Sequence, residues 1–588
     1  RSVPSTNGRF RNAPATLWPE KKKRRSKRVP YGASLRRALV GGIEVEVWDV
    51  VVLGDGPAGL AAAANAASEG ANVLLMASEA LGRRDPRMAD GLAAAIDEST
   101  NRGHREDTIR SGAFLSDQDI VASVTSSAVR EADLLERRGV IFRRDLRGLP
   151  HVRRLPGHGQ PRVVGSGDAD ARELQQVMEE QCMRHGVVRR SDQVPLRLVH
   201  TAQRVQGIVV ADLTGGRILG LQCKALILAD GGASDLAQTG RGGHGLALAL
   251  EADIPLRDME FLASTPLGVR DTAMTLPLGL LADGAVICES DGSPIELGDD
   301  LTSAVDAVRT AKEAVIDLRN LGEARPWYDA TFRLLSQRLG VDADRQTVAI
   351  EPRAYASLGG VPVDEEGRAV IGAWSRWFTG LYAAGGTACT GLHGAGLLPG
   401  NLVLDALTSG RAAGASAAAW LVDQAHGGSR AVADAVEQAE ADVAAMMAPA
   451  EDEGGVVRTG AVTSAVSALI RGVFDGGTSA DELAAALETI DALAVSAEAL
   501  HLDDQSLVAN ANFEAVLAAQ HGVHQARAML QSAMARTESR GVHVRHDHPD
   551  MDADQMHHTL VSSDGTIDTL AVRKGVSGHW VLAPAESA

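Results

Sequence analysis

The chain has few aromatic residues, few cysteines and no long uncharged apolar run. Phe, Trp and Tyr make up 3% of its 588 residues, so the hydrophobic cores must be built mainly from Ala, Val and Leu. No run reaches the roughly 18 apolar residues of a membrane span without Gly and polar interruptions, so we predict no transmembrane segment. The scattered cysteines lack CxxC or CxH spacing, which argues against a zinc or iron–sulfur site held by this chain alone. They are Cys182, Cys223, Cys288 and Cys389.

Charge is also missing from one segment. Residues 379–405, TGLYAAGGTACTGLHGAGLLPGNLVLD, contain no Asp, Glu, Lys or Arg between Gly380 and Leu404. The residue order predicts a strand, a Gly-rich turn and a helix, which is typical of an element that contacts a dinucleotide. Such a segment can hold an aromatic cofactor by shape and backbone, but it offers little to bind an anionic substrate. His393 is its only side chain with acid–base chemistry near neutral pH.

The charge that is present is segregated. Residues 1–37 contain 12 Lys or Arg and one acid, whereas the whole chain has a net charge of −18. The run KKKRRSKR at 21–28 fits a nucleic-acid or membrane-surface contact, a nuclear address, a targeting segment, or a solvated and disordered tail. The acidic remainder of the chain is unsuited to phosphate backbones, so we expect it to have no nucleic-acid partner.

A dinucleotide-binding turn is predicted at residues 54–59, Gly-Asp-Gly-Pro-Ala-Gly. The run VVVL before it is too apolar for a strand with one wet face and belongs in a buried parallel sheet. In such a turn the first glycine permits the tight bend, the second lets the backbone approach a pyrophosphate, and the third lets helix and strand pack closely. Contacts with the dinucleotide are predicted for Gly54, Gly56, Pro57, Ala58 and Gly59, and after the next strand for Ser78 and Glu79. A surface role for Glu79 remains the alternative.

Further motifs follow in order along the chain. They are REDTIRSGAFLSD (105–117), PGHGQPR (156–162), LILADGGAS (226–234), GLYAAG…TGLHGA (380–395) and TESRGVHVRHDHPDMD (537–552) followed by HHTL (557–560). Together with GDGPAGLAAA at 54–63, they resemble the flavoprotein subunits of succinate dehydrogenase and fumarate reductase, and L-aspartate oxidase. The resemblance spans about residues 47–588.

The resemblance implies an α/β fold with a Rossmann-like FAD-binding domain, an inserted α+β capping domain and a C-terminal helical domain. The helical pattern after residue 430 and the broken α/β rhythm between 255 and 356 agree with it. We therefore expect a basic, disordered extension at 1–43, the FAD-binding domain at 44–254 and 357–430, the capping domain at 255–356, the helical domain at 431–537 and a tail domain at 538–588.

The resemblance also implies FAD as the cofactor. Some family members tether FAD through a histidine in a Ser-His-Thr sequence, but the corresponding stretch at 82–95 contains no histidine, so FAD is expected to bind non-covalently. Beyond the first turn, the resemblance implies further FAD contacts from Gly91, Asp230, Gly231, Gly385, Gly386, Asn401 and Leu402.

The family's dicarboxylate chemistry needs cations for two carboxylates and a proton donor opposite the flavin. Six positions that supply such groups, or contact the flavin, carry other residues here. The His-Pro-Thr motif falls on 264–267 (STPL), the Thr-Glu pair near Pro277-Leu278, the catalytic arginine near Ala304-Val305, the carboxylate-binding histidine on Tyr355, the Asn-Arg pair on Gly396-Leu397, and a flavin-contacting glutamate on Gly386. The sequence therefore predicts that the usual dicarboxylate-binding site is lost.

Three residues are candidates for a remaining catalytic role. Arg309 lies about one helical turn beyond the vacant arginine position, and the alternative is a surface role. Tyr355 can donate a hydrogen bond or a proton, or it can simply pack. His393 belongs to a flavin-facing motif, or it is structural. Five histidines near the C-terminus suggest a metal cluster but belong to the family signature, so no metal ligands are predicted: His543, His546, His548, His557 and His558.

Two functional hypotheses follow. In the first, the chain is a flavin oxidoreductase with a remodelled pocket for a less charged substrate. In the second, it is a catalytically inactive paralogue that serves as a binding or assembly subunit. By family analogy the expected partner is an iron–sulfur subunit or an active homologous subunit, and a homo-oligomer is left open. We expect a cytoplasmic location or one peripheral to the inner face of a membrane, with an N-terminal targeting segment not excluded.

Overall fold

The computed structural model describes residues 36–82, 88, 90–94, 98–372, 376–448, 457–502 and 504–584. Most of the predicted N-terminal extension, including the basic run at 21–28, lies outside these residues. Within the described part, β1 (Arg36–Val40) pairs antiparallel with β2 (Ile43–Leu53). Regular structure therefore begins before residue 44, the predicted start of the FAD-binding domain.

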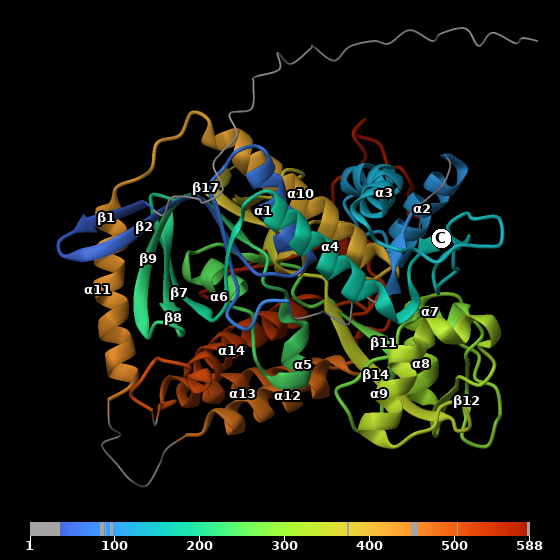
Figure 1. The fold of residues 1–588 in the computed structure, drawn as a ribbon. Helices are drawn as coiled ribbons and strands as arrows, with labels where there is room; N and C mark the ends of the chain where they lie inside the picture. Colours follow the sequence, from blue (N-terminus) through green and yellow to red (C-terminus); the bar gives the residue numbers. More distant parts are fainter. Residues whose placement is uncertain are drawn as a thin grey trace, which may run out of the picture.

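A nine-stranded mixed sheet forms the centre of the largest domain (Figure 1). In it, β2 pairs in parallel with both of its main neighbours, and Val50, Val51 and Val52 are fully buried. The predicted buried parallel strand is thus confirmed. The other strands of this sheet are β3 (Val73–Met76), β6 (Val188–Arg190), β7 (Gln193–Thr201), β8 (Arg204–Asp212), β9 (Arg217–Leu228), β16 (Arg368–Ile371) and β17 (Arg376–Ala383).

Small residues let two helices lie close together on one face of this sheet. Between α1 (Pro57–Ser68) and α10 (Asn401–Leu421), a Cβ at Gly410 would come within 2.3 Å of the Ala58 oxygen, and one at Gly414 within 2.2 Å of the Ala62 oxygen. Only glycine allows this approach, which explains how a chain poor in aromatics builds a dense core. Other helices of this domain are α2 (Glu98–Ser111), α3 (Gln118–Arg138), α4 (Asp170–Arg184), α5 (Leu236–Thr239) and α6 (His244–Glu251).

The capping domain is inserted between strands of the main sheet. It contains a four-stranded sheet in the order β11-β14-β13-β12. In this sheet β11 and β14, the first and last of the four strands along the chain, pair antiparallel. Leu267, Ile316 and Tyr328 belong to its hydrophobic core. The elements are β11 (Leu262–Val269), α7 (Gly279–Ala282), β12 (Val286–Glu289), α8 (Leu301–Thr310), β13 (Ala314–Asp317), α9 (Asp329–Leu339) and β14 (Val348–Ser357).

The helical segment divides into two parts. The helix α11 (Ser429–Met446) packs its Val432 and Val436 against Val45 and Val209 of the main sheet. The boundary that we predicted at residue 431 therefore assigns to the helical domain a helix that packs on the sheet. Three helices form the bundle at the bottom of Figure 1: α12 (Thr459–Phe474), α13 (Ala480–Glu498) and α14 (Ala511–Ala535). Ser479 caps α13 and forms a capping box with Glu482.

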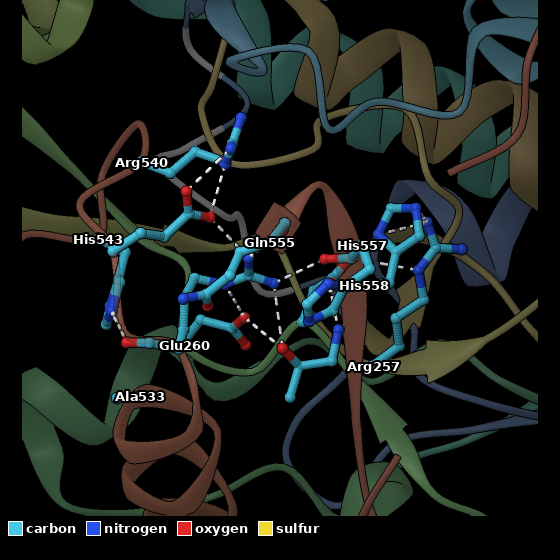
Figure 2. Close-up of polar contacts among 12 residues, drawn as sticks. Arg257, Glu260, Ala533, Arg540, His543, Gln555, His557 and His558 are labelled. Carbon is cyan, nitrogen blue, oxygen red and sulfur yellow. Dashed lines mark hydrogen bonds and ion pairs between the residues drawn. The ribbon is translucent and has the colours of Figure 1, made fainter. Parts of the chain in front are cut away.

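The C-terminal tail is fastened to the rest by buried ion pairs (Figure 2). Arg536 Nε lies 2.7 Å from Glu260 Oε1, and Arg536 Nη1 lies 2.9 Å from Glu538 Oε1 of the tail. The tail strands β19 (His557–Val561) and β20 (Ile567–Ala571) form a sheet with β10 (Leu256–Arg257). Two further short pairs complete the fold: β4 (Leu92–Ala93) with β5 (Val163–Val164), and β15 (Val361–Pro362) with β18 (Ala388–Cys389).

The histidines of the tail make contacts with the protein itself. His558 Nδ1 lies 2.8 Å from Asp258 Oδ2, and its Nε2 lies 2.8 Å from Arg257 Nη2. His543 Nε2 lies 3.4 Å from the backbone oxygen of Arg536. Across the described residues, His, Cys, Asp and Glu side chains form no group of three or more that could hold a metal ion. Nor does any helix in the described part combine the length and apolarity needed to cross a membrane.

Candidate functional site

The three glycines of the predicted dinucleotide turn have different surroundings. Gly54 has φ +108°, and a Cβ there would lie 2.2 Å from the Ala229 oxygen, while a Cβ on Gly59 would lie 2.0 Å from the Gly54 oxygen. A Cβ on Gly56 would meet no atom within 4 Å. Gly54 and Gly59 are thus required for packing, whereas Gly56 leaves open space at the N-terminus of α1, where free N–H groups favour phosphate. Pro57 occupies the first turn of α1.

The end of the neighbouring strand β9 offers a second open position. Gly231 has φ +103°, and a Cβ there would meet nothing within 4 Å. Its N–H donates to Thr387 Oγ1 at 2.9 Å, and the preceding Asp230 accepts a hydrogen bond from the Gly245 N–H at 2.8 Å. Because β2 and β9 are parallel, Gly56 and Gly231 follow the carboxyl ends of adjacent strands, where ligands bind in open α/β sheets. These residues fit a dinucleotide.

The second Gly-rich turn packs against the first. Gly385 has φ +59°, and its Cβ would lie 2.7 Å from the Ala58 Cβ. A Cβ on Gly386 would lie 3.2 Å from the Gly232 nitrogen. The turn after β17 therefore closes over the start of α1 and the end of β9, and the contact roles of Gly385 and Gly386 stay predictions.

Several other predicted contacts have identified partners. Asn401 is fully buried, with Oδ1 2.8 Å from His104 Nε2 and Nδ2 donating to Thr108 Oγ1 at 3.1 Å. Its side chain thus braces α2, which leaves its backbone at the N-terminus of α10 for a cofactor; Leu402 follows it, half-buried. Ser78 and Glu79 are half-buried after β3. Their roles as cofactor contacts remain predictions.

Two family motifs form a polar support under the 396–401 turn. Arg162 Nη1 lies 2.7 Å from Asp107 Oδ2, and His158 Nε2 lies 2.8 Å from the Pro399 oxygen. Burial lowers the pKa of His158 to about 3 and that of His104 to about 4, so both rings are neutral near pH 7. The sequence contains both motifs, but only the structure gives them this supporting role.

His393 lies buried beside an acid. Its Nε2 is 3.4 Å from Asp405 Oδ2 without hydrogen-bond geometry, and neither ring nitrogen has a hydrogen-bond partner among the described residues. Asp405 is held by the Thr390 hydroxyl at 3.0 Å. A buried ring nitrogen without a partner can receive a hydrogen bond from, or give one to, a ligand, so His393 keeps its place as a candidate.

Tyr355 meets an acid that the sequence did not single out. Its hydroxyl donates a short hydrogen bond to Asp90 Oδ2, and the Leu278 N–H donates to Asp90 Oδ1 at 2.8 Å. Tyr355 and Asp90 are each 4% exposed. The only local signal for Asp90 was an acid within an otherwise Gly- and Ala-rich stretch, directly before the predicted flavin contact Gly91.

Arg309 is the third candidate, and its positive charge is paired with two carboxylates. It forms ion pairs with Asp306 and, at 3.3 Å, with Asp475 of the helical segment. It lines a small pocket between the capping domain and the C-terminal segments, together with Ser264, Val305, Leu397, Phe474 and Val544. Three of the positions predicted to have lost charged or polar groups therefore meet in one pocket: Ser264, Val305 and Leu397.

Comparison with known proteins gives matches over most of the chain. Residues 49–403 match the family model of the FAD binding domain, and residues 477–583 match that of the fumarate reductase flavoprotein C-terminus. The chain is 27% identical over 585 residues to the fumarate reductase flavoprotein subunit of Escherichia coli K12, covering 88% of this chain and 92% of that one. It is 31% identical over 405 residues to L-aspartate oxidase of Mycobacterium leprae, covering 63% and 74%.

Solved structures show the same fold. A quinol fumarate reductase from E. coli superposes with a TM-score of 0.82 at 23% identity, covering 92% of this chain and 98% of that one. The Sdh1 structure of Mycobacterium smegmatis gives a TM-score of 0.74, also at 23% identity, covering 90% of this chain and 94% of that one. The predicted α/β fold and the predicted cofactor are confirmed. The chain belongs to the FAD-binding flavoprotein family of fumarate reductase, succinate dehydrogenase and L-aspartate oxidase.

Proposed function

We propose that this protein is an FAD-dependent oxidoreductase whose substrate carries less negative charge than a dicarboxylate. The observation that carries the proposal is the pocket of Ser264, Val305 and Leu397, in which the one arginine is already paired with two aspartates. A dianion would need at least one free cation there, because a buried carboxylate without a partner is strongly destabilised.

Losing an arginine–carboxylate contact at a buried site typically costs about 2–5 kcal/mol, or roughly 30- to 4,000-fold in affinity. Arg309 is turned toward Asp306 and Asp475, so it would have to leave both carboxylates before it could bind a substrate anion. Apolar walls at Val305 and Leu397 favour an uncharged or singly charged substrate instead.

When bound, FAD supplies hydride transfer to or from a carbon atom of the substrate. The chain's own residues then have three tasks. The turns at Gly56 and Gly231 bind the dinucleotide, the capping domain keeps water from the reacting atoms, and a buried acid moves the proton that accompanies the hydride.

We predict that the FAD-loaded protein will not react with dicarboxylates. Anaerobic addition of succinate or L-aspartate should leave the visible flavin absorbance unchanged. After reduction with dithionite, the uncharged probe dimethyl fumarate should reoxidise the bound flavin at least about tenfold faster than fumarate, relative to the same ratio for free reduced FAD. Stopped-flow absorbance measures both rates.

The Arg309→Ala variant is the matched test of the neutralised arginine. Because Arg309 is paired with two aspartates, this variant should reoxidise with both probes at wild-type rates. Bleaching by succinate, or a loss of rate in Arg309→Ala, would contradict the proposal. A flavin-loaded protein that reacts with neither probe would instead support a binding or assembly subunit.

The names of the relatives bear on the partner. Several are flavoprotein subunits, whereas L-aspartate oxidase is not named as one. We propose that this chain also works beside a partner subunit that passes electrons, at the surface of a membrane or in the cytoplasm. Co-purification of a tagged full chain from its native cell, followed by iron analysis, tests this proposal.

A further inference from the structure

Asp90 is a buried carboxyl placed where three elements meet. It precedes β4 of the FAD-binding domain, it accepts the backbone N–H of Leu278 from the capping domain, and it accepts the phenol of Tyr355 from β14. The resemblance places lost polar groups of the family at both of the latter positions. Gly91, the next residue, is a predicted flavin contact. A carboxyl thus reaches the junction of the capping domain and the predicted flavin site from the segment before β4.

A β-bulge sets the direction of the Tyr355 side chain. Along the β11–β14 pair, Ala263 lies opposite Ala356 and Ser264 opposite Ala354, so Tyr355 is the extra residue between them. Bulges of this kind redirect a side chain out of the regular alternation and are frequent beside active sites. Here the redirected phenol points at Asp90.

The charged neighbours of this pair are few. Arg153 Nη2 lies 3.5 Å from Asp170 Oδ2, and Arg153 Nη1 donates to Tyr328 at 3.3 Å. Burial raises the pKa of Asp90 to about 6, against the hydrogen bonds from Tyr355 and Leu278 and the field of Arg153. Burial likewise raises the pKa of Asp170 to about 7, and Asp90 adds to that rise.

We propose that Asp90 and Tyr355 form the acid–base pair that handles the proton of the flavin reaction, with Tyr355 presenting it to the substrate and Asp90 replenishing it. This inference rests on the proposed function. It assigns to Asp90 a role as the positioning and relay residue, and to Tyr355 the contact with the substrate.

The step balances as follows in the reductive direction. With Asp90 neutral, its carboxyl O–H donates a hydrogen bond to the phenol oxygen, which frees the O–H of Tyr355 for the substrate. That O–H bond breaks as its proton joins the substrate carbon adjacent to the one that receives the hydride. The proton of the neutral Asp90 carboxyl then moves to the phenolate oxygen, which leaves Asp90 ionised. Bound reduced FAD would supply the hydride with its electron pair, and solvent would return one proton to Asp90 in each turnover.

The reduction potential of the bound flavin tests the placement of Asp90 without any substrate. An ionised carboxylate near the ring opposes the negative charge of the reduced cofactor. Asp90→Asn should therefore have a higher potential than the wild type at pH 8, and the same potential at pH 5, where Asp90 is already protonated. Dye-equilibrated titration of the FAD-loaded full chain at both pH values measures this difference.

Two more variants separate chemistry from structure. Tyr355→Phe removes a hydrogen bond that lowers the Asp90 pKa, so the pH-dependent step in potential should move to higher pH. Asp283→Asn makes the same isosteric change at another buried carboxylate, which is held by Tyr328 at 2.7 Å and Arg143 at 2.9 Å. It should leave the potential unchanged at both pH values.

The rate gives an independent readout. Tyr355→Phe should slow reoxidation by dimethyl fumarate about 10²- to 10⁴-fold at saturating probe, which is the usual rate contribution of a positioned proton donor. Variants of Asp90 and Tyr355 that change the unfolding midpoint but match the wild type in potential and rate would overturn the acid–base pair. A wild type that binds no FAD would overturn the proposed function as well.

Discussion

Replacing Gly56 with leucine will remove FAD while leaving the fold intact. A Cβ at Gly56 meets no protein atom within 4 Å, so the larger side chain enters only the space that the structure leaves open after β2. That space lies at the N-terminus of α1, where the backbone must approach the pyrophosphate. We expect FAD affinity to fall about 100-fold or more, which corresponds to roughly 2.7 kcal/mol. Fluorescence titration with FAD measures the affinity, and thermal unfolding of the apoprotein measures the fold.

Two glycines provide controls for this result. Gly460, near the start of α12, also has open space around its Cβ position, so Gly460→Leu should bind FAD normally. Gly59→Leu would place Cβ 2.0 Å from the Gly54 oxygen, so this variant should fail to fold. Wild-type affinity in Gly56→Leu would show that the pyrophosphate lies elsewhere.

Replacing Arg257 with methionine will destabilise the whole protein. The guanidinium is completely buried, with Nη2 2.8 Å from Asp117 Oδ2 and Nε 3.2 Å from Asp258 Oδ2. Although burial alone would raise their pKa values, Arg257 and His558 hold the pKa of Asp117 well below its usual range and that of Asp258 at about 2. Removing the arginine leaves two buried carboxylates with too little positive charge. We expect a loss of about 3–5 kcal/mol in the free energy of unfolding, measured by urea denaturation.

The pH dependence gives the sign of this effect. A carboxylate with a depressed folded-state pKa contributes stability above its ordinary pKa, and that stability is lost as the pH falls through the folded value. Without Arg257 both carboxylates take up protons at higher pH, so the deficit of the variant should be largest near pH 7 and should shrink below about pH 4.

The matched control is another arginine with two acidic partners. The side chain of Arg309 is 27% exposed, and solvent screens its pairs with Asp306 and Asp475. Arg309→Met should therefore cost less than about 1 kcal/mol. Equal losses in the two variants would contradict the view that burial, and not the number of partners, sets the cost.

Local patterns were sufficient for the cofactor turn. The apolar run from Val50 to Leu53 forms the end of a buried strand. The glycines at 54, 56 and 59 follow it, and the Ala-rich segment after them forms α1. The structure has them as the sequence predicts. The packing of α11 on the main sheet was not visible in this way, because its apolar stripe fits a bundle and a sheet equally well.

The candidate site was only partly predictable. The positions predicted to have lost polar groups could be named from the sequence, and so could Tyr355. Asp90 could not, because it lies 265 residues from Tyr355 along the chain and reaches it only through the capping domain. The partner of Arg309 in the helical segment, Asp475, is similarly remote, at 166 residues. Neither contact leaves a local signature.

The sequence by itself determined that this chain has a Rossmann-like fold with FAD as its cofactor and belongs to the fumarate reductase family, and it predicts the loss of that family's charged substrate contacts. These conclusions depend on glycines that act through their own backbone and on positions where the family's charged residues are missing. Only the tertiary structure decided that Arg309 is neutralised and that Asp90 meets Tyr355, because charge balance and proton transfer depend on which groups from distant segments come within a few ångströms of one another.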